Sequence, residues 1–205
     1  MKTALFSALT FLLFSSTIAT DQPDAVLDVS GQELRTRTYY YVLPVIRGRG
    51  GGLSLDSATD ADPNIGCPLV VVQEQQEVSN GLPLYFSPVN VEQQGSVVRL
   101  STDLNVIFNA STICLQSTLW ELAFDKSLQK FVVATGGALG NPGSETLNNW
   151  FKIERFEDDY KLVFCPGVCD ICRPVCGELG VFVDVDGIRR LVLADEPLKV
   201  VFKRV

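Results

Sequence analysis

The amino-acid sequence predicts an all-β domain. Short runs of β-branched, aromatic and other apolar residues alternate with turn residues along most of the chain, and no segment combines a helical period with capping residues. About a dozen such runs fall within roughly 185 residues, a density typical of a β-sandwich or a closed barrel. The tyrosines at 39–41, Trp120 and Trp150 could each open a unit of several strands, which suggests a three-fold β-trefoil. Periodicity alone does not separate a trefoil from a sandwich.

The expected strands follow one another from the tyrosine run to the end of the chain. The runs 181–185 and 188–193 are joined at Asp186 and Gly187, a dipeptide that predicts a two-residue type I′ hairpin turn. The longest stretch without a strand pattern is 136–149, which we expect to be a loop. The expected strands cover residues 38–46, 69–72, 97–100, 104–108, 120–124, 131–135, 150–156, 160–164, 181–185, 188–193 and 198–202.

Residues 1–20 have the layout of a secretory signal peptide. Lys2 gives a positive start, an apolar run covers residues 4–14, and Thr17 and Ala19 fit the small-residue positions before a cleavage site. The alternative, a membrane anchor, needs about 20 apolar residues, more than this run supplies. We therefore expect one domain over residues 21–205 that is secreted, either to the extracellular space or to the vacuole through the secretory pathway.

The chain is acidic, with a formal net charge of −7 at pH 7. Nucleic acids and anionic lipid surfaces attract basic proteins, so neither a nucleic acid nor a membrane is an expected partner. Asn109, Ala110 and Ser111 form the one N-x-S/T sequon of the sequence. In a secreted chain this makes Asn109 a candidate glycosylation site on an exposed turn.

Four of the six cysteines lie close together near the C-terminus, at Cys165, Cys169, Cys172 and Cys176. In a reducing compartment such a cluster would favour a zinc site, whereas in a secreted chain it favours disulfides. The predicted signal peptide and the even number of cysteines therefore favour a disulfide-linked domain without a bound metal. The spacing does not decide which cysteines pair.

The sequence contains no histidine. This excludes Ser-His-Asp and Cys-His catalytic groups as well as histidine-ligated metal sites. The acidic residues that lie closest together, Asp56, Asp60 and Asp62, occupy a stretch rich in Ser, Ala and Pro that is typical of a solvated loop rather than of a catalytic pair. We therefore expect a binding protein rather than an enzyme, with no cofactor.

Several segments, taken together, resemble one known family of plant proteins. The N-terminal signature of that family, from which Ser30 departs, is matched by a set of spaced residues: Val26, Asp28, Gly31, Gln32, Leu34, Tyr40 and Val42. Further matching segments are 40–44 (YYVLP), 67–69 (CPL), 140–143 (GNPG), 150–154 (WFKIE), 160–166 (YKLVFCP) and 189–193 (RRLVL). They span nearly all of residues 21–205 and resemble the Kunitz soybean trypsin inhibitor family of plants, in particular its miraculin-like branch.

The resemblance implies a β-trefoil of about twelve strands with pseudo-three-fold symmetry and long loops. It also implies three disulfides, Cys67–Cys114, Cys165–Cys176 and Cys169–Cys172. In the chain-entropy model, the first of these closes about 47 residues and should stabilise the fold by roughly 4 kcal/mol. The last encloses too few residues to restrict the unfolded chain much, so we expect it to stiffen a loop.

Inhibitors of the resembled family present a rigid, convex loop to the active site of an endopeptidase as a pseudo-substrate, and affinity comes from preorganisation. The family's loop follows a Ser-Pro step between the fourth and fifth strands. This implies a reactive loop with Asn90 as its P1 residue, made of Ser87, Pro88, Val89, Asn90 and Val91. The asparagine that supports the loop in the family corresponds to Thr36.

Three features of this loop argue against trypsin as the target. The S1 pocket of trypsin contains an aspartate and selects Lys or Arg, whereas Asn90 is uncharged. The loop extends to Ser96, longer than the family pattern, and Thr36 lacks the amide that would bridge loop carbonyls on two sides. Arg47 and Arg49, weighed as alternative P1 residues, lie among four glycines that would be costly to order, so a solvated turn is expected there.

The sequence therefore supports two functions from different classes. The first is a secreted Kunitz-type inhibitor of a serine or cysteine endopeptidase other than trypsin. The alternative is a non-inhibitory storage or defence-related binding protein on the same fold. In both cases the two tryptophans are assigned to the core. Because pairing of all cysteines leaves no thiol for a covalent dimer, we expect a monomer.

Overall fold

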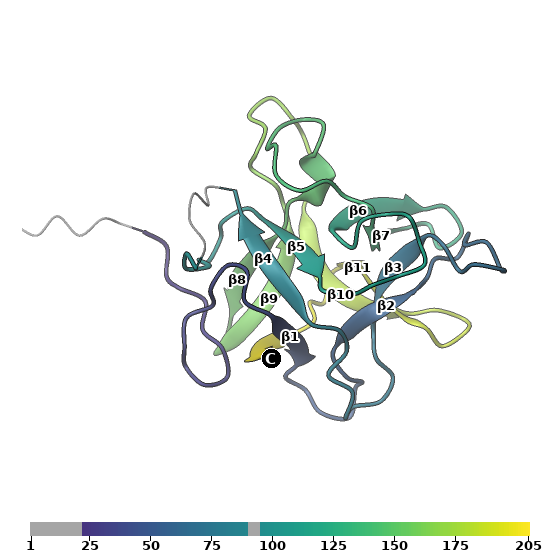
Figure 1. The fold of residues 1–205 in the computed structure, drawn as a ribbon, viewed down its shortest axis with the longest axis horizontal. Helices are drawn as coiled ribbons and strands as arrows, with labels where there is room; N and C mark the ends of the chain where they lie inside the picture. Colours follow the sequence, from purple (N-terminus) through teal and green to yellow (C-terminus); the bar gives the residue numbers. More distant parts are fainter. Residues whose placement is uncertain (1–21, 90–94) are drawn as a thin grey trace, which may run out of the picture.

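Three successive units of four strands build the part of the protein that the structure describes (Figure 1). The computed structural model describes residues 22–89 and 95–205. The predicted signal peptide lies outside the described residues, as do Asn90 and Val91 of the predicted reactive loop. The strands are β1 (Tyr40–Pro44), β2 (Leu53–Ser57), β3 (Leu69–Gln73), β4 (Leu84–Pro88), β5 (Leu104–Phe108), β6 (Trp120–Asp125), β7 (Lys130–Thr135), β8 (Lys152–Phe156), β9 (Asp159–Phe164), β10 (Gly177–Val183), β11 (Arg189–Ala194) and β12 (Val200–Arg204).

Six of these strands close into a barrel. Antiparallel ladders join β1 to β4 and β12, β4 to β5, and β9 to β8 and β12. A bridge between Leu104 and Phe151 connects β5 to the residue just before β8 and completes the ring. Each barrel strand is thus paired on both sides, which removes the free edges at which β-sheets associate.

The other six strands form three hairpins beside the barrel, β2–β3, β6–β7 and β10–β11 (Figure 1). One strand of each hairpin contacts one strand of both others, so that β3, β7 and β11 form a triangle. The contacts pair Val70 with Ala134, Val132 with Val192, and Arg190 with Val72. The three contacts repeat the same pattern around one axis, and the predicted pseudo-three-fold β-trefoil is confirmed.

Arg190 breaks the symmetry of this triangle. Its equivalents in the other two hairpins are Val70 and Val132, in an apolar cluster, whereas Arg190 is a charged residue with a relative exposure of 3%. The Arg190 Nε donates to Asp184 Oδ2 at 2.8 Å, and its Nη1 donates to the carbonyl oxygen of Ser57 at 3.0 Å. A buried ion pair thus occupies one corner of the triangle.

Aromatic side chains fill much of the barrel interior. Phe86 meets Phe202 edge to face with their ring centroids 5.5 Å apart, and Trp120 meets Phe151 in the same way at 5.8 Å. Such geometry adds a favourable quadrupole interaction to the burial of large apolar surfaces. Trp120 and Trp150 are both buried, as their assignment to the core predicts.

The sequence pattern finds most of the strands but misses β2 and β4. β2 reads LSLDS and β4 reads LYFSP, so polar residues and a terminal proline weaken the strand signal in both. The expected strand 97–100 is wrong, because its residues make only isolated bridges, from Val97 to Arg35 and from Arg99 to Ala25. The partner of that stretch is the irregular N-terminal segment rather than a regular strand.

The connection between β10 and β11 is not the predicted two-residue turn. The register leaves residues 184–188 outside the ladder, and of these only Gly187 has a positive φ, of 81°. A type I′ turn needs positive φ at both central residues. Instead, Asp184 Oδ1 accepts the N–H groups of Asp186 and Ile188, both at 2.9 Å, so the Asp184 side chain organises the turn.

The structure has the three disulfides that the resemblance implies, Cys67–Cys114, Cys165–Cys176 and Cys169–Cys172. The first ties the β2–β3 connection to the β5–β6 connection. The other two lie in the β9–β10 connection, where their sulfurs are bonded to each other and are not available as zinc ligands.

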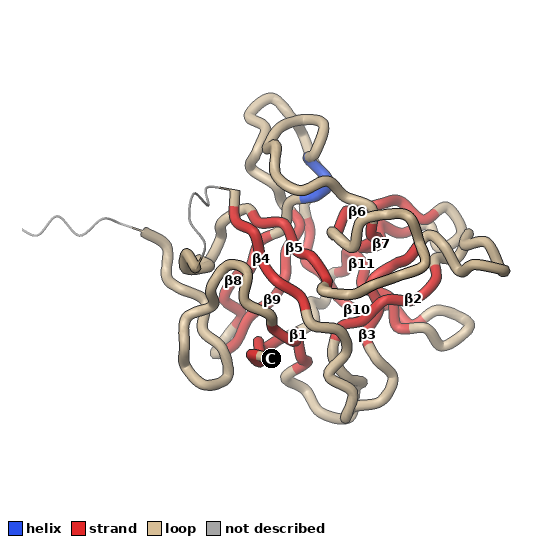
Figure 2. The backbone as a smooth tube through the Cα atoms, in the orientation of Figure 1, coloured by secondary structure: helices blue, strands red, loops and turns tan. Residues whose placement is uncertain are grey.

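Long connections surround the strands (Figure 2). In the described part of the chain they contain one short helical element, the 3₁₀ turn η1 (Leu147–Asn149), which lies in the loop expected at 136–149. No helix within residues 22–89 and 95–205 is long and apolar enough to cross a membrane. The surface of the protein is therefore made largely of loops held on a closed β framework.

Candidate functional site

The β4–β5 connection is anchored where it leaves β4. Ser87 and Pro88, which the sequence assigns to the reactive loop, are the last two residues of β4 and pair with β5. The N–H of Val89 then donates to the carbonyl oxygen of Asp103 at 2.8 Å. Ser87 and Pro88 therefore fix the start of the connection rather than belonging to its exposed part.

The connection is held again where it returns, at Gly95. Thr36 is buried, with a relative exposure of 3%, and its Oγ1 accepts the Gly95 N–H at 3.0 Å. The backbone N–H of Thr36 donates to the carbonyl oxygen of Ser96 at 2.9 Å. Arg35 Nη1 donates to the carbonyl oxygen of Gly95 at 3.1 Å. Thr36, which the resemblance assigns to loop support, contacts this end of the connection from the N-terminal segment.

The N-terminal segment is itself held by tyrosines of the core. The Tyr40 hydroxyl accepts the Arg35 N–H, and the Tyr160 hydroxyl accepts the Leu27 N–H, both at 2.9 Å. Both tyrosines are buried, so the support of the connection reaches back into the barrel. The exposed ion pair between Arg35 and Glu33, at 2.7 Å, adds little stability by comparison. Sequence reasoning misses Arg35 and Asp103, because their partners lie far away in the sequence.

Replacing Thr36 with valine should weaken the hold on Gly95 while the fold is kept. Valine matches the shape of threonine but has no hydroxyl, so the Gly95 N–H loses its acceptor at a cost of about 1–3 kcal/mol. We expect faster hydrogen exchange of the Gly95 amide, measured by NMR. Thr36→Ser keeps the hydroxyl and should exchange like the parent protein; equal exchange in the two variants would contradict this role.

The glycine-rich connection between β1 and β2 has the expected solvated turn at Arg47 and Arg49, and its following glycines, 50–52, are buried. The Gly52 N–H donates to the carbonyl oxygen of Ser79 at 2.8 Å, and Gly52 is buried. A Cβ atom on Gly52 would lie 2.1 Å from the carbonyl oxygen of Asn80, so this position requires glycine for close backbone approach. Arg47 and Arg49 remain exposed on the same connection.

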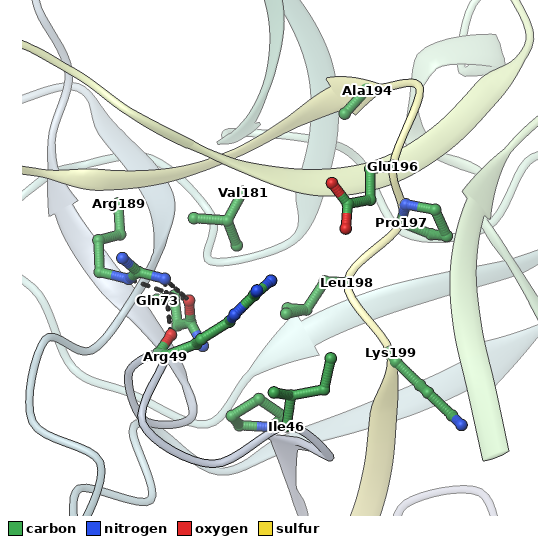
Figure 3. Close-up of a pocket in the computed structure, with 11 residues that line it drawn as sticks. Ile46, Arg49, Gln73, Val181, Arg189, Ala194, Glu196, Pro197, Leu198 and Lys199 are labelled. Atoms are coloured by element: carbon green, nitrogen blue, oxygen red, sulfur yellow. Dashed lines mark hydrogen bonds between the residues drawn. The ribbon is translucent and has the colours of Figure 1, made fainter.

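A shallow cavity of about 220 Å³ lies beside this connection (Figure 3). Arg189 spans its inner wall: Nε and Nη2 donate to Gln73 Oε1 at 3.0 and 2.8 Å, and Nη2 also donates to the carbonyl oxygen of Arg49 at 2.6 Å. Ligand sites usually enclose about 300–1,000 Å³. The small volume and the internal pairing indicate that Arg189 fastens the β1–β2 connection to the hairpin triangle.

One charged residue at the edge of the cavity, Lys199, does not point into it. Figure 3 shows Lys199 pointing away from the other lining side chains. Its Nζ lies 2.7 Å from Glu157 and 3.2 Å from Asp159, and hydrogen bonds to these two carboxylates raise the pKa of Lys199. No group of three or more cysteine or acidic residues within the described part of the chain is placed to hold a metal ion.

Asn109 lies directly after β5 and is exposed. Its backbone N–H donates to the carbonyl oxygen of Pro83 at 2.8 Å, so the main chain is fixed while the side chain remains accessible. This placement is compatible with a glycan. Glycosylation of Asn109 stays a prediction.

The closed barrel, the triangle of β3, β7 and β11, and the braced connections define a disulfide-linked β-trefoil with long loops. The chain belongs to the legume Kunitz family, described as "Trypsin and protease inhibitor", whose model matches residues 26–204. The family that the sequence motifs resemble is thereby confirmed.

The relatives are named for inhibition more often than for anything else. The chain is 47% identical over 182 residues to Kunitz trypsin inhibitor 5 of Arabidopsis thaliana, covering 88% of this chain and 86% of the relative. It is 46% identical over 191 residues to miraculin of Synsepalum dulcificum, covering 91% and 86%. Among solved structures it is similar to the Kunitz-type cysteine protease inhibitor PCPI-3 from potato, with a TM-score of 0.74, 28% identity, and coverage of 89% of this chain and 98% of that chain. Kunitz trypsin inhibitor 5 is thus named for inhibition of a serine protease, and PCPI-3 for inhibition of a cysteine protease.

Proposed function

We propose that the protein inhibits an endopeptidase by entering its active site as a pseudo-substrate through the β4–β5 connection. The observation that carries this proposal is the bracing of both ends of the connection. Val89 is bound to Asp103 at one end, and Gly95 is bound to Thr36 and Arg35 at the other. Fixed ends reduce the conformational entropy lost on binding, which is the source of affinity for inhibitors of this kind.

The proposed P1 residue is Asn90, followed by Val91, between these two fixed ends. An uncharged P1 side chain does not suit the S1 pocket of trypsin, which selects Lys or Arg. The proposed target is therefore a serine or cysteine endopeptidase with another P1 preference. The names of the relatives, a trypsin inhibitor and a cysteine protease inhibitor, support this class of partner.

The proposed setting is the secretory pathway, with residues 1–20 removed as a signal peptide. Three disulfides in a chain of 205 residues support an oxidising compartment. We place the mature protein outside the cell or in the vacuole, as a monomer that acts by binding and not by catalysis, with Asn109 available for a glycan.

Titration of purified residues 21–205 against trypsin, chymotrypsin, subtilisin and papain tests the proposed loop. We expect stoichiometric inhibition of at least one enzyme other than trypsin, weakened about 30-fold or more in Asn90→Ala, because a P1 side chain is a hot spot of such an interface. Asn64→Ala removes an exposed asparagine of the β2–β3 connection and should leave inhibition unchanged. Strong trypsin inhibition that depends on Asn90 would contradict the proposed specificity.

The second candidate is a non-inhibitory storage or defence-related binding protein. One structural observation favours it: Thr36, whose side chain accepts the Gly95 N–H, offers a hydroxyl in place of the amide that would bridge loop carbonyls on two sides. The 46% identity to miraculin is in line with this alternative. Absence of inhibition across the whole panel would support it over the first candidate.

A further inference from the structure

Two side chains of opposite charge face the shallow cavity beside the β1–β2 connection without meeting each other. Figure 3 shows the Arg49 guanidinium and the Glu196 carboxylate directed into the space between Val181 and Leu198. Both charged residues are exposed, and neither forms an ion pair within the described part of the chain. Opposite charges that share a cavity but stay apart leave room for a ligand that carries one charge of each sign.

The inner wall of the cavity adds a second positive group, Arg189. Gln73 is 2% exposed, and because its Oε1 accepts both the Nε and the Nη2 of Arg189, it holds that guanidinium in place. Arg189 likewise forms no ion pair with any residue of 22–89 and 95–205. The Gln73 Nε2 has no hydrogen-bond partner among the described residues, so the protein itself does not satisfy every polar group of this wall. Positive charge and donor groups at the wall suit an anionic group of a ligand.

Apolar side chains line much of the remaining cavity. Val181 and Leu198 are half-buried, and three further apolar residues belong to the lining, namely Pro44, Ile46 and Pro197. The cavity volume of about 220 Å³ lies below the range of about 300–1,000 Å³ that drug-sized ligands occupy, so it suits a smaller molecule. A matching ligand combines a carboxylate for the arginines, a cationic group for the acidic side chain and a short apolar part. A free amino acid with an aliphatic side chain has all three.

The cavity and the β4–β5 connection lie at opposite ends of the barrel. β1 runs antiparallel to β4, and Tyr40 at the start of β1 pairs with Leu84 at the start of β4. Pro44, which ends β1 and lines the cavity, therefore lies beyond Leu84, whereas the β4–β5 connection leaves β4 after Pro88. A small ligand in the cavity thus leaves the connection that carries Asn90 free.

We propose that this cavity binds a free α-amino acid with an aliphatic side chain. The ligand carboxylate faces Arg49 and Arg189, and the ligand ammonium group faces Glu196. Contact of the aliphatic side chain with Val181 and Leu198 removes apolar surface from water. A simple anion would be repelled by the Glu196 carboxylate, whereas the zwitterion is not. This site does not depend on the proposed inhibition of an endopeptidase.

NMR titration of isotope-labelled residues 21–205 with L-leucine tests the proposal. We expect saturable shifts of the Val181 and Leu198 amides at millimolar leucine or below. Isocaproate is leucine without its ammonium group and isoamylamine is leucine without its carboxylate, and each should bind about 10-fold or more weakly, because one charged contact is lost.

Two variants assign the two charged contacts to side chains. Arg49→Gln and Glu196→Gln should each weaken leucine binding about 10-fold. Glu196→Gln should also abolish the preference for leucine over isocaproate, and Arg49→Gln should reduce the preference for leucine over isoamylamine. Misfolding would weaken all three ligands and cannot produce such a selective change.

Arg47→Gln and Asp195→Asn are the matched controls, because they make the same charge changes at exposed neighbouring positions outside the lining of the cavity. Both should leave leucine binding unchanged, as should Asn90→Ala, whatever that variant does to protease inhibition. Absence of saturable shifts with leucine would overturn the proposal. Equal weakening by Arg47→Gln and Arg49→Gln would do so as well, since it would reflect only the net charge of the protein. Equal affinities of the parent protein for leucine and isocaproate would show a simple anion site instead.

Discussion

Asp184→Ala should lower the free energy of unfolding by about 3–5 kcal/mol, because it leaves a buried guanidinium without its carboxylate. Arg190 is 3% exposed and donates to Asp184 across 2.8 Å. The same substitution removes the acceptor for the N–H groups of Asp186 and Ile188, which set the β10–β11 turn. Urea unfolding followed by tryptophan fluorescence measures the loss, provided that the m-value stays constant.

Two further variants distinguish the contribution of the buried ion pair to stability from that of the β10–β11 turn. Asp186→Ala changes an exposed acidic residue of the same turn and should cost less than about 0.5 kcal/mol, as surface substitutions usually do. Combining Asp184→Ala with Arg190→Met should recover part of the loss, since apolar replacement of a buried pair is often close to neutral. Valines already stand at the two equivalent positions of the triangle. A loss in Asp184→Ala no greater than in Asp186→Ala would show that the buried pair does not stabilise the fold.

The pH dependence of the Asp184→Ala effect follows from the environment of this carboxyl group. Burial raises the pKa of Asp184, but hydrogen bonds from Arg190 and from the Ile188 and Asp186 amides, with the charge of Arg190, outweigh burial and hold the pKa below its ordinary value. A group with a lowered folded-state pKa contributes stability that is present above its unfolded pKa, about 3.9 for Asp, and is lost as the pH falls through the folded pKa. The difference between parent and variant should therefore shrink only in acid, below about pH 4.

The strands that could be predicted from the sequence are those rich in residue types that favour β-structure. The stretches around Trp120 and Tyr160 are rich in aromatic and β-branched residues, and both form strands. Residues 97–100 carry the same signal but lie against the irregular N-terminal segment, so no ladder forms. β2 carries a weak signal and becomes a strand because β3 pairs with it over its whole length. For residues 97–100 and for β2, the pairing partner rather than the local sequence decides whether a regular strand forms.

The residues of the candidate site also fall into two groups: those that the sequence identifies and those that only the fold brings together. The Ser-Pro step and Thr36 could be identified by resemblance, because they occupy positions of a known motif. The contact of Arg35 with Gly95 could not, since the residues are 60 positions apart and neither type is distinctive. The contact of Val89 with Asp103 could not be predicted either, because it joins two backbone groups and carries no side-chain signal.

Replacing Cys67 and Cys114 together by serine should reduce the free energy of unfolding by about 4 kcal/mol, the second large effect expected. The bond closes 47 residues, and its removal lets the unfolded chain sample many more conformations. The β5–β6 connection would also lose its link to the β2–β3 connection, although Gln116 would still hold it to Thr135. Urea unfolding should therefore show a lower midpoint, and hydrogen exchange should rise first in residues 109–118.

The disulfide Cys169–Cys172 supplies the matched control, because it spans a sequence separation of 3 and the chain-entropy model gives it less than about 2 kcal/mol. Its removal should leave exchange in the β5–β6 connection unchanged. Inhibition that depends on Asn90 should persist, since its connection is held by Thr36, Arg35 and Asp103. Equal stability losses in the two double variants would show that loop closure does not account for the stabilisation.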